Sequence, residues 1–371
     1  MWRQIYFQTI LNMVRVLFLG ENWFGSCARA CCFALRRLGC DVRDIDLQTI
    51  FPQLRMRSSR VVLRLLAPRL MREYNQVILE VSRQFSPDFL LAFKGSYVQL
   101  ETLRELRSLG VALYNYYPDR VLLARHTSLE RTISEYNCFF DTKQYWDGDA
   151  AEHFYPRCRK FLPHGYDPEI HHPVELEDRD RRQFECDACL IATHTSGKEA
   201  VLEELLRLRP KLDLKIWGNL WEDNCRSTEV RNRVCGAALN GMSYTKAVLA
   251  SRINLALMGV TPEAKDQTST RTYEIPACGG FMLHPRNAEV LDLYADRSEI
   301  VCFDSAREMA EQIDYYLANP EERFAIAQAG YARCVPAYSY EKRMVEILNW
   351  HEDRMKHASA GGQDHRCYGR Y

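Results

Sequence analysis

The sequence predicts an α/β protein made of two Rossmann-like domains, each with a parallel sheet flanked by helices. Two observations predict this fold class. Short apolar strand signals alternate with helix signals along two successive stretches of the chain, which is typical of right-handed βαβ units. The length of 371 residues suits two domains, and a composition of 47% hydrophobic and 26% charged residues indicates a folded globular chain.

The first stretch opens with a strand from Val14 to Leu19, a β-branched and apolar run that Gly20 ends. A helix from Ser26 to Leu38 follows, and Gly39 lies just past its end, where a C-cap is expected. Further strands are predicted at residues 42–47, 89–93, 111–116, 138–141 and 161–162, with a helix at 99–109.

The second stretch repeats this order, with strands predicted at residues 188–193, 214–217, 253–257, 280–283 and 300–303. Ser196 with Glu199 matches a capping box, and Ser305 with Glu308 matches a second. Other helices are expected to begin at Ser243, at Asn319 and near Ser339. We therefore expect one domain over residues 1–165 and a second over 166–338. In the segment 339–371, a helix is expected to pack back toward the first domain before a frayed polar tail.

Charge and cysteine content exclude several classes of protein. The 49 Lys and Arg residues balance the 49 Asp and Glu residues, which argues against a nucleic-acid-binding protein. No apolar run approaches the ~20 residues of a membrane span, and the N-terminus lacks the apolar core of a signal peptide, so we expect a cytoplasmic protein. The 14 cysteines are expected to be free thiols. Neither the Cys186–Cys189 pair nor the histidines at 164, 171 and 172 predict a metal site.

Polar residues fill the loops that follow the predicted strands, where ligands of parallel sheets bind. Thr195, Ser196 and Lys198 stand between a strand and a capped helix. Their hydroxyl, backbone N–H and ammonium groups suit a phosphate or pyrophosphate. An equally open alternative is that this loop only caps the helix. The loop is not a P-loop, because Ala192 and Glu199 replace the required Gly and Ser or Thr.

The loop after the first strand does not match a dinucleotide-binding fingerprint. Gly20, Asn22 and Gly25 occur in the run Gly-Glu-Asn-Trp-Phe-Gly, which is not G-x-G-x-x-G. A nicotinamide-dependent dehydrogenase is therefore not expected. We expect this loop to hold another ligand over the edge of the sheet.

The most specific stretch of the chain runs from Asp266 to Leu283 and reads DQTSTRTYEIPACGGFML. It predicts a polar loop, a short helix and a glycine pair before a buried strand. Arg271 suits a bidentate contact with phosphate oxygens, and Glu274, one turn later, can accept both hydroxyl groups of a ribose. The glycines at 279 and 280 allow a backbone to approach a ligand closely.

This stretch resembles the donor-binding signature of glycosyltransferases with the GT-B fold, and in detail that of the CgeB-like family, named after a spore-maturation protein. The match is almost letter for letter from Arg271 to Leu283. Weaker matches bring the resemblance to most of residues 14–350, and they lie at His164–Asp167, Ile216–Gly218, Tyr244, Pro87–Gly95 and Asn115–Asp119. The resemblance implies two Rossmann-like domains that face a cleft, with a nucleotide-sugar donor bound mainly by the second domain.

The resemblance also assigns residues to the two sides of such a site. It implies that the donor is bound by Thr195, Ser196, Lys198, Gly218, Tyr244, Arg271, Glu274, Gly279 and Gly280. It implies that the acceptor side includes Gly20, Asn22, Gly25 and Lys94. A hexosyltransferase-like enzyme of polysaccharide or glycan biosynthesis is expected, with a glycan, lipid or protein acceptor and with neither a cofactor nor a metal.

Related retaining enzymes carry a Glu-x7-Glu pair, whose second Glu binds the ribose while the first lies near the sugar. Glu274 occupies the second position, and Asp266, one methylene shorter, occupies the first. Positive groups and helix N-termini are expected to stabilise the leaving diphosphate without a metal. An inverting route would need a base as well, and His126 and Asp119 are the candidates.

Two other functions remain open at this point. A nucleotide-sugar 2-epimerase can share the GT-B architecture, and it would turn over the nucleotide sugar without an acceptor. A non-catalytic protein that binds a nucleotide sugar is the second alternative, and Asp266 is the feature that favours it.

The segment Gln53–Arg72 carries six arginines and no acidic residue, with Val61, Val62, Leu65 and Leu66 among them. One interpretation is a solvated, arginine-rich helix face. The other is a basic amphipathic patch that contacts an anionic membrane or a lipid-linked acceptor, which would make the protein peripherally membrane-associated.

Overall fold

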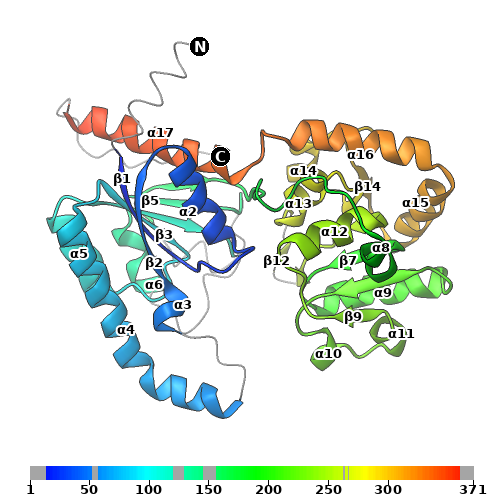
Figure 1. Cartoon of the computed structure of the whole chain (residues 1–371), viewed down its shortest axis with the longest axis horizontal. Coiled ribbons are helices and arrows are strands. Elements are labelled where there is room, and N and C mark those ends of the chain that lie inside the picture. The colour runs from blue at the N-terminus through cyan, green and yellow to red at the C-terminus, as the bar shows by residue number, and fades with distance from the viewer. Residues whose placement is uncertain are drawn as a thin grey trace. The chain divides into compact units, whose positions relative to one another are not determined.

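The structure is a computed structural model and describes residues 14–51, 57–119, 129–144, 156–261, 264–265 and 267–359. The chain forms two compact units (Figure 1). Unit 1 comprises the residues up to Pro163 together with those from Tyr340 onward, and unit 2 comprises His164–Ser339. The chain therefore passes between the units twice.

The sheet of unit 1 has six parallel strands in the order β2-β1-β3-β4-β5-β6. Their bounds are β1 (Arg15–Gly20), β2 (Asp41–Asp46), β3 (Phe89–Phe93), β4 (Ala112–Tyr117), β5 (Cys138–Asp141) and β6 (Arg159–Phe161). Buried apolar residues alternate between the two faces of each central strand. The order reverses between β1 and β3, which makes their carboxyl ends the switch point of this sheet.

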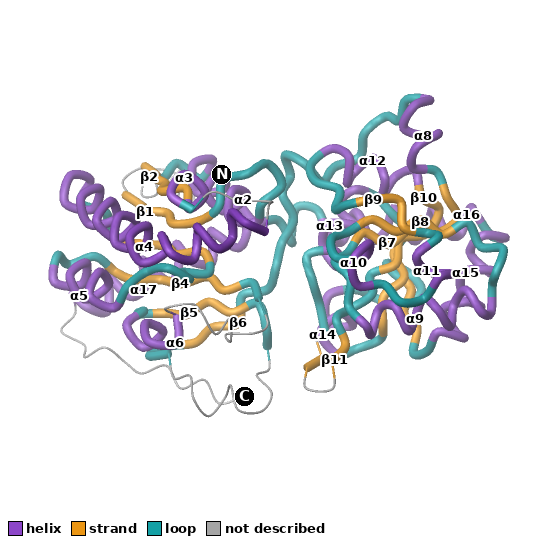
Figure 2. The backbone as a smooth tube through the Cα atoms, turned by 90° about the horizontal axis from the view of Figure 1, so that it is seen from below, coloured by secondary structure: helices purple, strands orange, loops and turns teal. Residues whose placement is uncertain are grey.

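Helices cover both faces of this sheet (Figure 2). One face carries α2 (Cys27–Arg37) and α17 (Tyr340–Ser359), and the buried stripe of α17 consists of Tyr340, Met344, Ile347 and Leu348. The other face carries α3 (Leu47–Ile50), α4 (Arg57–Phe85), α5 (Leu100–Ser108), α6 (Leu129–Thr132) and the short 3-10 helix η1 (Ile133–Glu135). The helix expected to begin near Ser339 is thus present as α17.

The sheet of unit 2 also has six parallel strands, in the order β14-β13-β10-β7-β8-β9. Their bounds are β7 (Cys186–Ile191), β8 (Leu214–Trp217), β9 (Val234–Gly236), β10 (Ser251–Leu255), β13 (Met282–Pro285) and β14 (Val301–Phe303). A separate antiparallel pair joins β11 (Val260–Thr261) to β12 (Ala264–Lys265). The order reverses between β7 and β10, so their carboxyl ends form the switch point of unit 2.

Two helical layers enclose the sheet of unit 2 as well. The first contains α9 (Ser196–Leu208), α10 (Trp221–Asn224), α11 (Thr228–Arg231), α15 (Ala306–Ala318) and α16 (Pro320–Cys334). The second contains α8 (Asp178–Phe184), α12 (Met242–Ala250), α13 (Arg271–Cys278) and α14 (Ala288–Leu293). The two ends of this unit meet, because Tyr166 pairs with Ser339 in an isolated bridge and donates its N–H to the carbonyl of Tyr338 at 3.2 Å.

Two predicted helix starts are wrong. Thr195, not Ser196, caps α9: its backbone is extended and its hydroxyl accepts the N–H of Lys198, whereas Ser196 is already helical. Similarly, α12 begins at Met242 after Gly241, so Ser243 lies inside the helix and does not cap it. Ser305 and Asn319 occupy the predicted N-cap positions. The capping box at Ser305 is only half formed, because the Glu308 carboxylate accepts the N–H of Asp304 and not that of Ser305.

Three further facts complete the fold. Of the segment Gln53–Arg72, residues 57–72 form the first half of α4, which continues to Phe85, and residues 53–56 lie outside the described residues. Every cysteine in the described part of the chain is a free thiol. No described helix combines the length and the apolar character needed to cross a membrane.

Candidate functional site

A narrow gap between side chains, with no room for a water molecule, lies at the switch point of unit 2, where ligands of open α/β sheets bind. Strands β7 and β10 supply one wall, and α12 and α13 supply the other. The lining residues are Cys189, Ile191, Tyr244, Asn254, Leu255, Arg271 and Ile275. Two residues predicted to bind a donor, Tyr244 and Arg271, are therefore brought together here.

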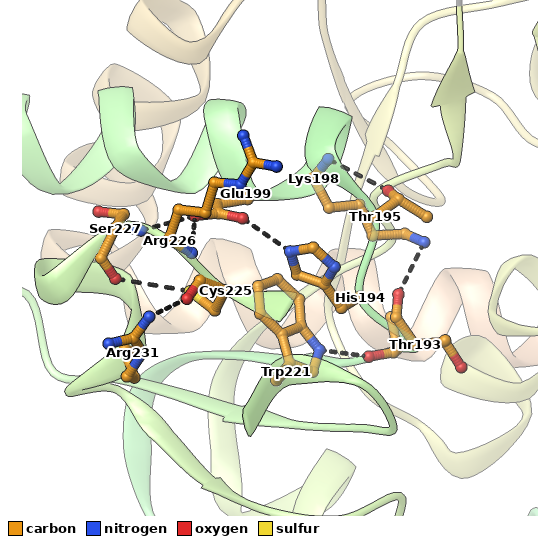
Figure 3. A network of polar contacts seen from close by, with 11 residues as sticks. Thr193, His194, Thr195, Lys198, Glu199, Trp221, Cys225, Arg226, Ser227 and Arg231 are labelled. Carbon is orange, nitrogen blue, oxygen red and sulfur yellow. Dashed lines mark hydrogen bonds and ion pairs between the residues drawn. The ribbon is translucent and has the colours of Figure 1, made fainter. Parts of the chain in front are cut away.

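The loop between β7 and α9 places a buried cation at the start of a helix (Figure 3). The hydroxyl of Thr195 accepts the N–H of Lys198 at 3.3 Å. The ammonium group of Lys198 turns back and donates to the carbonyl oxygen of Thr193 at 3.1 Å. The positive charge of Lys198 is thus added to the positive end of the α9 dipole, an arrangement that suits an anion.

The sequence predicted that Glu199 forms the second half of a capping box, but the structure shows a different role. Its carboxylate accepts three hydrogen bonds, from Nε2 of His194 at 2.7 Å and from the backbone N–H groups of Arg226 and Ser227 at 2.6 and 2.7 Å (Figure 3). Burial alone would raise the pKa of Glu199, but these hydrogen bonds outweigh burial and lower the pKa to about 2. Glu199 therefore fixes the loop before α9 to the loop before α11.

Gly218 has a packing role in the same region. It has a φ of +157°, and a Cβ added to it would lie 1.8 Å from the carbonyl oxygen of Ala192. Trp221 donates its indole N–H to that same oxygen at 2.7 Å (Figure 3). The close approach of these two loops explains the glycine without any ligand.

The first turn of α13 carries Arg271 and Glu274, the other charged residues predicted to bind the donor. Arg271 donates from its guanidinium group to the carbonyl oxygen of Leu257 at 2.9 Å, which holds it beside the chain that leaves β10. Glu274 follows one turn later. At the far end of the helix, Gly279 is left-handed with a φ of +84°, and a Cβ on Gly280 would lie 2.5 Å from a methyl carbon of Val248. The glycine pair thus ends α13 and packs it on α12.

Glu274 leaves 13% of its side chain exposed and lies beside two neutral side chains. Its Oε1 lies 3.9 Å from Nε2 of His171, and Tyr244 packs edge-on against the His171 ring with centroids 5.4 Å apart. Burial raises the pKa of Glu274 to about 7, although Thr270, Arg271 and Tyr244 each oppose this shift. The Tyr244 hydroxyl is buried and has no hydrogen-bond partner among the described residues. These polar groups can therefore accept further partners.

The orientation of His171 follows from its backbone contact. The N–H of Asp167 donates to Nδ1 of His171 at 3.0 Å, so the ring proton lies on Nε2, the nitrogen nearer to Glu274. Burial lowers the pKa of His171 to about 3, which keeps the ring neutral. The sequence suggested His171 only as a metal ligand, and the signal that could have placed it here is its position four residues after the His164–Asp167 segment of the resemblance.

The candidates on the acceptor side lie in unit 1. Lys94 and Asp119 form an ion pair of 3.0 Å. Asn22 donates to the carboxylates of Asp44 and Asp46. Gly20 packs tightly, since an added Cβ would lie 2.8 Å from Cβ of Ala28, and Gly25 is left-handed with a φ of +100°. Asp266 and His126 lie outside the described residues.

Comparison with known proteins identifies the fold. Residues 175–349 match the family model described as glycosyl transferase-like. Sucrose-phosphate synthase from Thermosynechococcus elongatus aligns with a TM-score of 0.61 at 10% identity over 93% of this chain and 100% of that one. HepE of Anabaena in complex with UDP and glucose aligns with a TM-score of 0.60 at 13% identity over 92% of this chain and 100% of that one. A UDP-N-acetylglucosamine 2-epimerase aligns with a TM-score of 0.51 at 12% identity over 92% of this chain and 98% of that one.

No curated protein sequence matches the chain. The structural alignments span nearly all of it, and both of its sheets have the parallel order of Rossmann-like units. The predicted fold class, an α/β protein of the GT-B type, is therefore confirmed.

Proposed function

We propose that the chain is a glycosyltransferase that transfers a sugar from a nucleoside-diphosphate sugar to an acceptor hydroxyl. One observation carries the proposal: the first turn of α13 sets Arg271 at the switch point of unit 2 and carries the largely buried carboxylate of Glu274 on the same turn. A cation beside a carboxylate matches the two polar parts of such a donor, its diphosphate and its ribose. The match of residues 175–349 to the glycosyl transferase-like family model supports the same function.

In this proposal Glu274 accepts hydrogen bonds from the ribose hydroxyls. Arg271 and Lys198 bind the diphosphate, helped by the N-termini of α13 and α9. As the bond to the sugar breaks, negative charge builds on the diphosphate, and these fixed positive groups stabilise it without a metal. We further propose retention of configuration and a hexose as the sugar, with Asp266 close to the reacting carbon.

A thermal-shift screen tests the donor site. UDP, GDP, ADP and dTDP, each with and without an attached hexose, are added to the full-length protein. A ligand present at about 100 times its Kd should stabilise the protein by ~2.7 kcal/mol. Glu274→Gln should lose this shift, while Glu308→Gln, in the first turn of α15 in the same unit, should keep it. A shift that survives in Glu274→Gln would place the nucleotide elsewhere.

The second candidate function is nucleotide-sugar epimerisation, which the structural likeness to a UDP-N-acetylglucosamine 2-epimerase favours. An epimerase inverts one carbon of the sugar and leaves the bond to the diphosphate in place at the end of the reaction. Incubation of the protein with UDP-hexoses and no acceptor, followed by NMR of the sugar, distinguishes the two functions. Binding without turnover in any mixture would instead favour a non-catalytic sugar-nucleotide-binding protein.

A further inference from the structure

The switch point of unit 1 lies at the carboxyl ends of β1 and β3, and the described residues there form a second cluster of polar and aromatic groups. The loop Glu21–Ser26 follows β1, and Lys94 follows β3. The two segments start close together in space, because a Cβ added to Gly20 at the end of β1 would lie 3.4 Å from Cβ of Phe93 at the end of β3.

Hydrogen bonds hold the loop after β1 in one conformation. Asn22 donates from its backbone to Asp46 at 3.2 Å and from its side chain to Asp44 at 3.1 Å. The N–H of Ser26 donates to the carbonyl of Trp23 at 3.0 Å, which closes a four-residue turn. Gly25 supplies the left-handed residue of that turn. The two aromatic residues between these anchors therefore project from a fixed turn.

Aromatic surface and a carboxylate stand together in this loop. The indole N–H of Trp23 donates to the carboxylate of Glu21 at 3.0 Å. Trp23 is half-buried, and Phe24 leaves 47% of its surface exposed. The Arg29 guanidinium lies 5.0 Å from the centre of the Phe24 ring. A fixed aromatic face beside hydrogen-bonding groups suits a ligand with apolar C–H faces and hydroxyl groups.

The charges of the cluster decide between classes of ligand. Lys94 has a left-handed backbone with a φ of +66°, and its ammonium group pairs with Asp119 at 3.0 Å. Burial lowers the pKa of Lys94, but the carboxylates of Asp119 and Glu21 outweigh burial and raise it. The carboxylates of Asp119 and Glu21 balance the cations of Lys94 and Arg29, so the cluster offers no excess positive charge to a phosphate. A neutral or amino sugar fits it better than an anionic acceptor.

We propose that the loop Glu21–Gly25 and Lys94 form a carbohydrate-binding subsite that receives the acceptor as a neutral or amino sugar. The sugar ring stacks on Trp23 and Phe24, and its hydroxyl groups hydrogen-bond to Glu21 and Lys94. This assignment names the acceptor class of the proposed glycosyltransferase, and its role as an acceptor site rests on that function.

The test uses the full-length protein on a glycan array that carries neutral, amino-sugar and carboxylated oligosaccharides, read at low and high salt. Wild-type protein should bind neutral or amino-sugar spots at both salt concentrations. Trp23→Ala and Glu21→Gln should each weaken this binding at least about tenfold. Trp23→Phe keeps a ring at the same position and should retain part of it. Phe324→Ala, which removes a 66% exposed phenylalanine from α16 of unit 2, should change nothing.

Absence of glycan binding by the wild type, or full binding by Trp23→Ala, would overturn the subsite. Exclusive, salt-sensitive binding of carboxylated glycans would overturn the charge argument. Calorimetric titration of UDP and the other nucleoside diphosphates into the same preparations separates this result from the donor site. Nucleotide binding without glycan binding contradicts the subsite alone, whereas glycan binding without nucleotide binding leaves the subsite and contradicts the proposed transferase.

Discussion

At the scale of single residues, the proposed donor site depends on the largely buried carboxylate of Glu274. Glu274 lies 3.9 Å from the protonated nitrogen of a neutral histidine, too far for a direct hydrogen bond. The Tyr244 hydroxyl beside it makes no hydrogen bond to a described residue. In the proposed complex, ribose hydroxyls add hydrogen bonds to this carboxylate, whose pKa burial raises and Thr270 and Tyr244 already lower.

Nucleotide affinity should therefore depend on the charge of Glu274. The pKa of Glu274 is raised to about 7, so the carboxylate that accepts ribose hydroxyls forms as pH rises through this value. We expect the affinity for UDP to rise over the same range, measured by calorimetry. The neighbouring His171 and Tyr244 do not change charge there, because the pKa of His171 is lowered to about 3 and that of Tyr244 is raised well above its usual value.

Glu274→Gln is the control for this dependence, since UDP itself titrates equally with both proteins. The variant should bind UDP about 10- to 100-fold more weakly at high pH, the expected loss for a hydrogen bond to a charged group. It should also lose the excess pH dependence of the wild type. An identical pH profile for the two proteins would show that Glu274 does not contact the nucleotide.

Lys198 and Arg271 are predicted to act on the leaving diphosphate. Lys198→Met and Arg271→Met should each lower kcat/KM by about tenfold or more, which corresponds to roughly 1.4 kcal/mol of transition-state stabilisation. Lys211→Met, an exposed lysine of the same unit, should leave the rate unchanged. EDTA should have little effect on the wild type. Strong inhibition by EDTA that magnesium or manganese reverses would contradict this assignment.

At the scale of elements, Glu199 connects α9 to a loop that is remote in the sequence. Glu199→Gln keeps the shape of the side chain but cannot accept the same charge-assisted hydrogen bonds. We expect a loss of about 1–3 kcal/mol in the free energy of unfolding near neutral pH, measured with urea. The pKa of Glu199 is lowered from 4.5 to about 2, so its contribution is present above pH 4.5 and is lost as pH falls toward 2. The free energies of unfolding of the wild type and of Glu199→Gln should therefore become equal as pH falls toward 2.

The first half of α4 is the second element that carries a prediction. Leu65 and Leu66 are 78% and 45% exposed there, and Arg69 and Arg72 are exposed beside them. If this segment contacts anionic membranes, the protein should co-sediment with vesicles that contain phosphatidylglycerol, and salt should reduce the bound fraction. Replacing Leu65 and Leu66 with Ser should remove binding, as should replacing Arg57, Arg60 and Arg64 with Gln. Leu109→Ser, at a half-exposed leucine of the same unit, is the matched control. If the wild-type protein stays in the supernatant at low salt, the membrane interpretation is wrong and the first half of α4 is a solvated helix face.

At the scale of the whole molecule, strands were more predictable than the contacts between them. The strand Phe89–Phe93 was predicted at its observed bounds, because a buried central strand is a continuous apolar run. The long helix α4 was predicted only as one alternative for residues 53–72, since arginines obscure its apolar face and Pro68 lies inside it. The contact of His171 with Glu274 joins segments that no local pattern relates, so only the fold could place the two together.

The path of the chain makes a prediction about which fragments fold. Unit 1 is completed by α17, which buries Tyr340, Met344, Ile347 and Leu348 against it. Burial of such side chains contributes about 1.5–3 kcal/mol each, which together approaches the whole stability of a domain. A fragment of residues 1–163 should therefore aggregate, and linking residues 340–371 to it should restore a cooperative thermal transition. Residues 164–339 alone should fold. A monomeric, cooperatively unfolding 1–163 fragment would contradict this.

The pairing of Tyr166 with Ser339 has a consequence for protein engineering. Because the two ends of unit 2 lie side by side, this unit is an insertion between two neighbouring points of unit 1. Unit 2 can in principle be exchanged as one segment, with one junction just before His164 and the other just after Ser339. A chimaera built in this way would transplant the nucleotide preference of another enzyme while every residue that belongs to unit 1, α17 included, stays native.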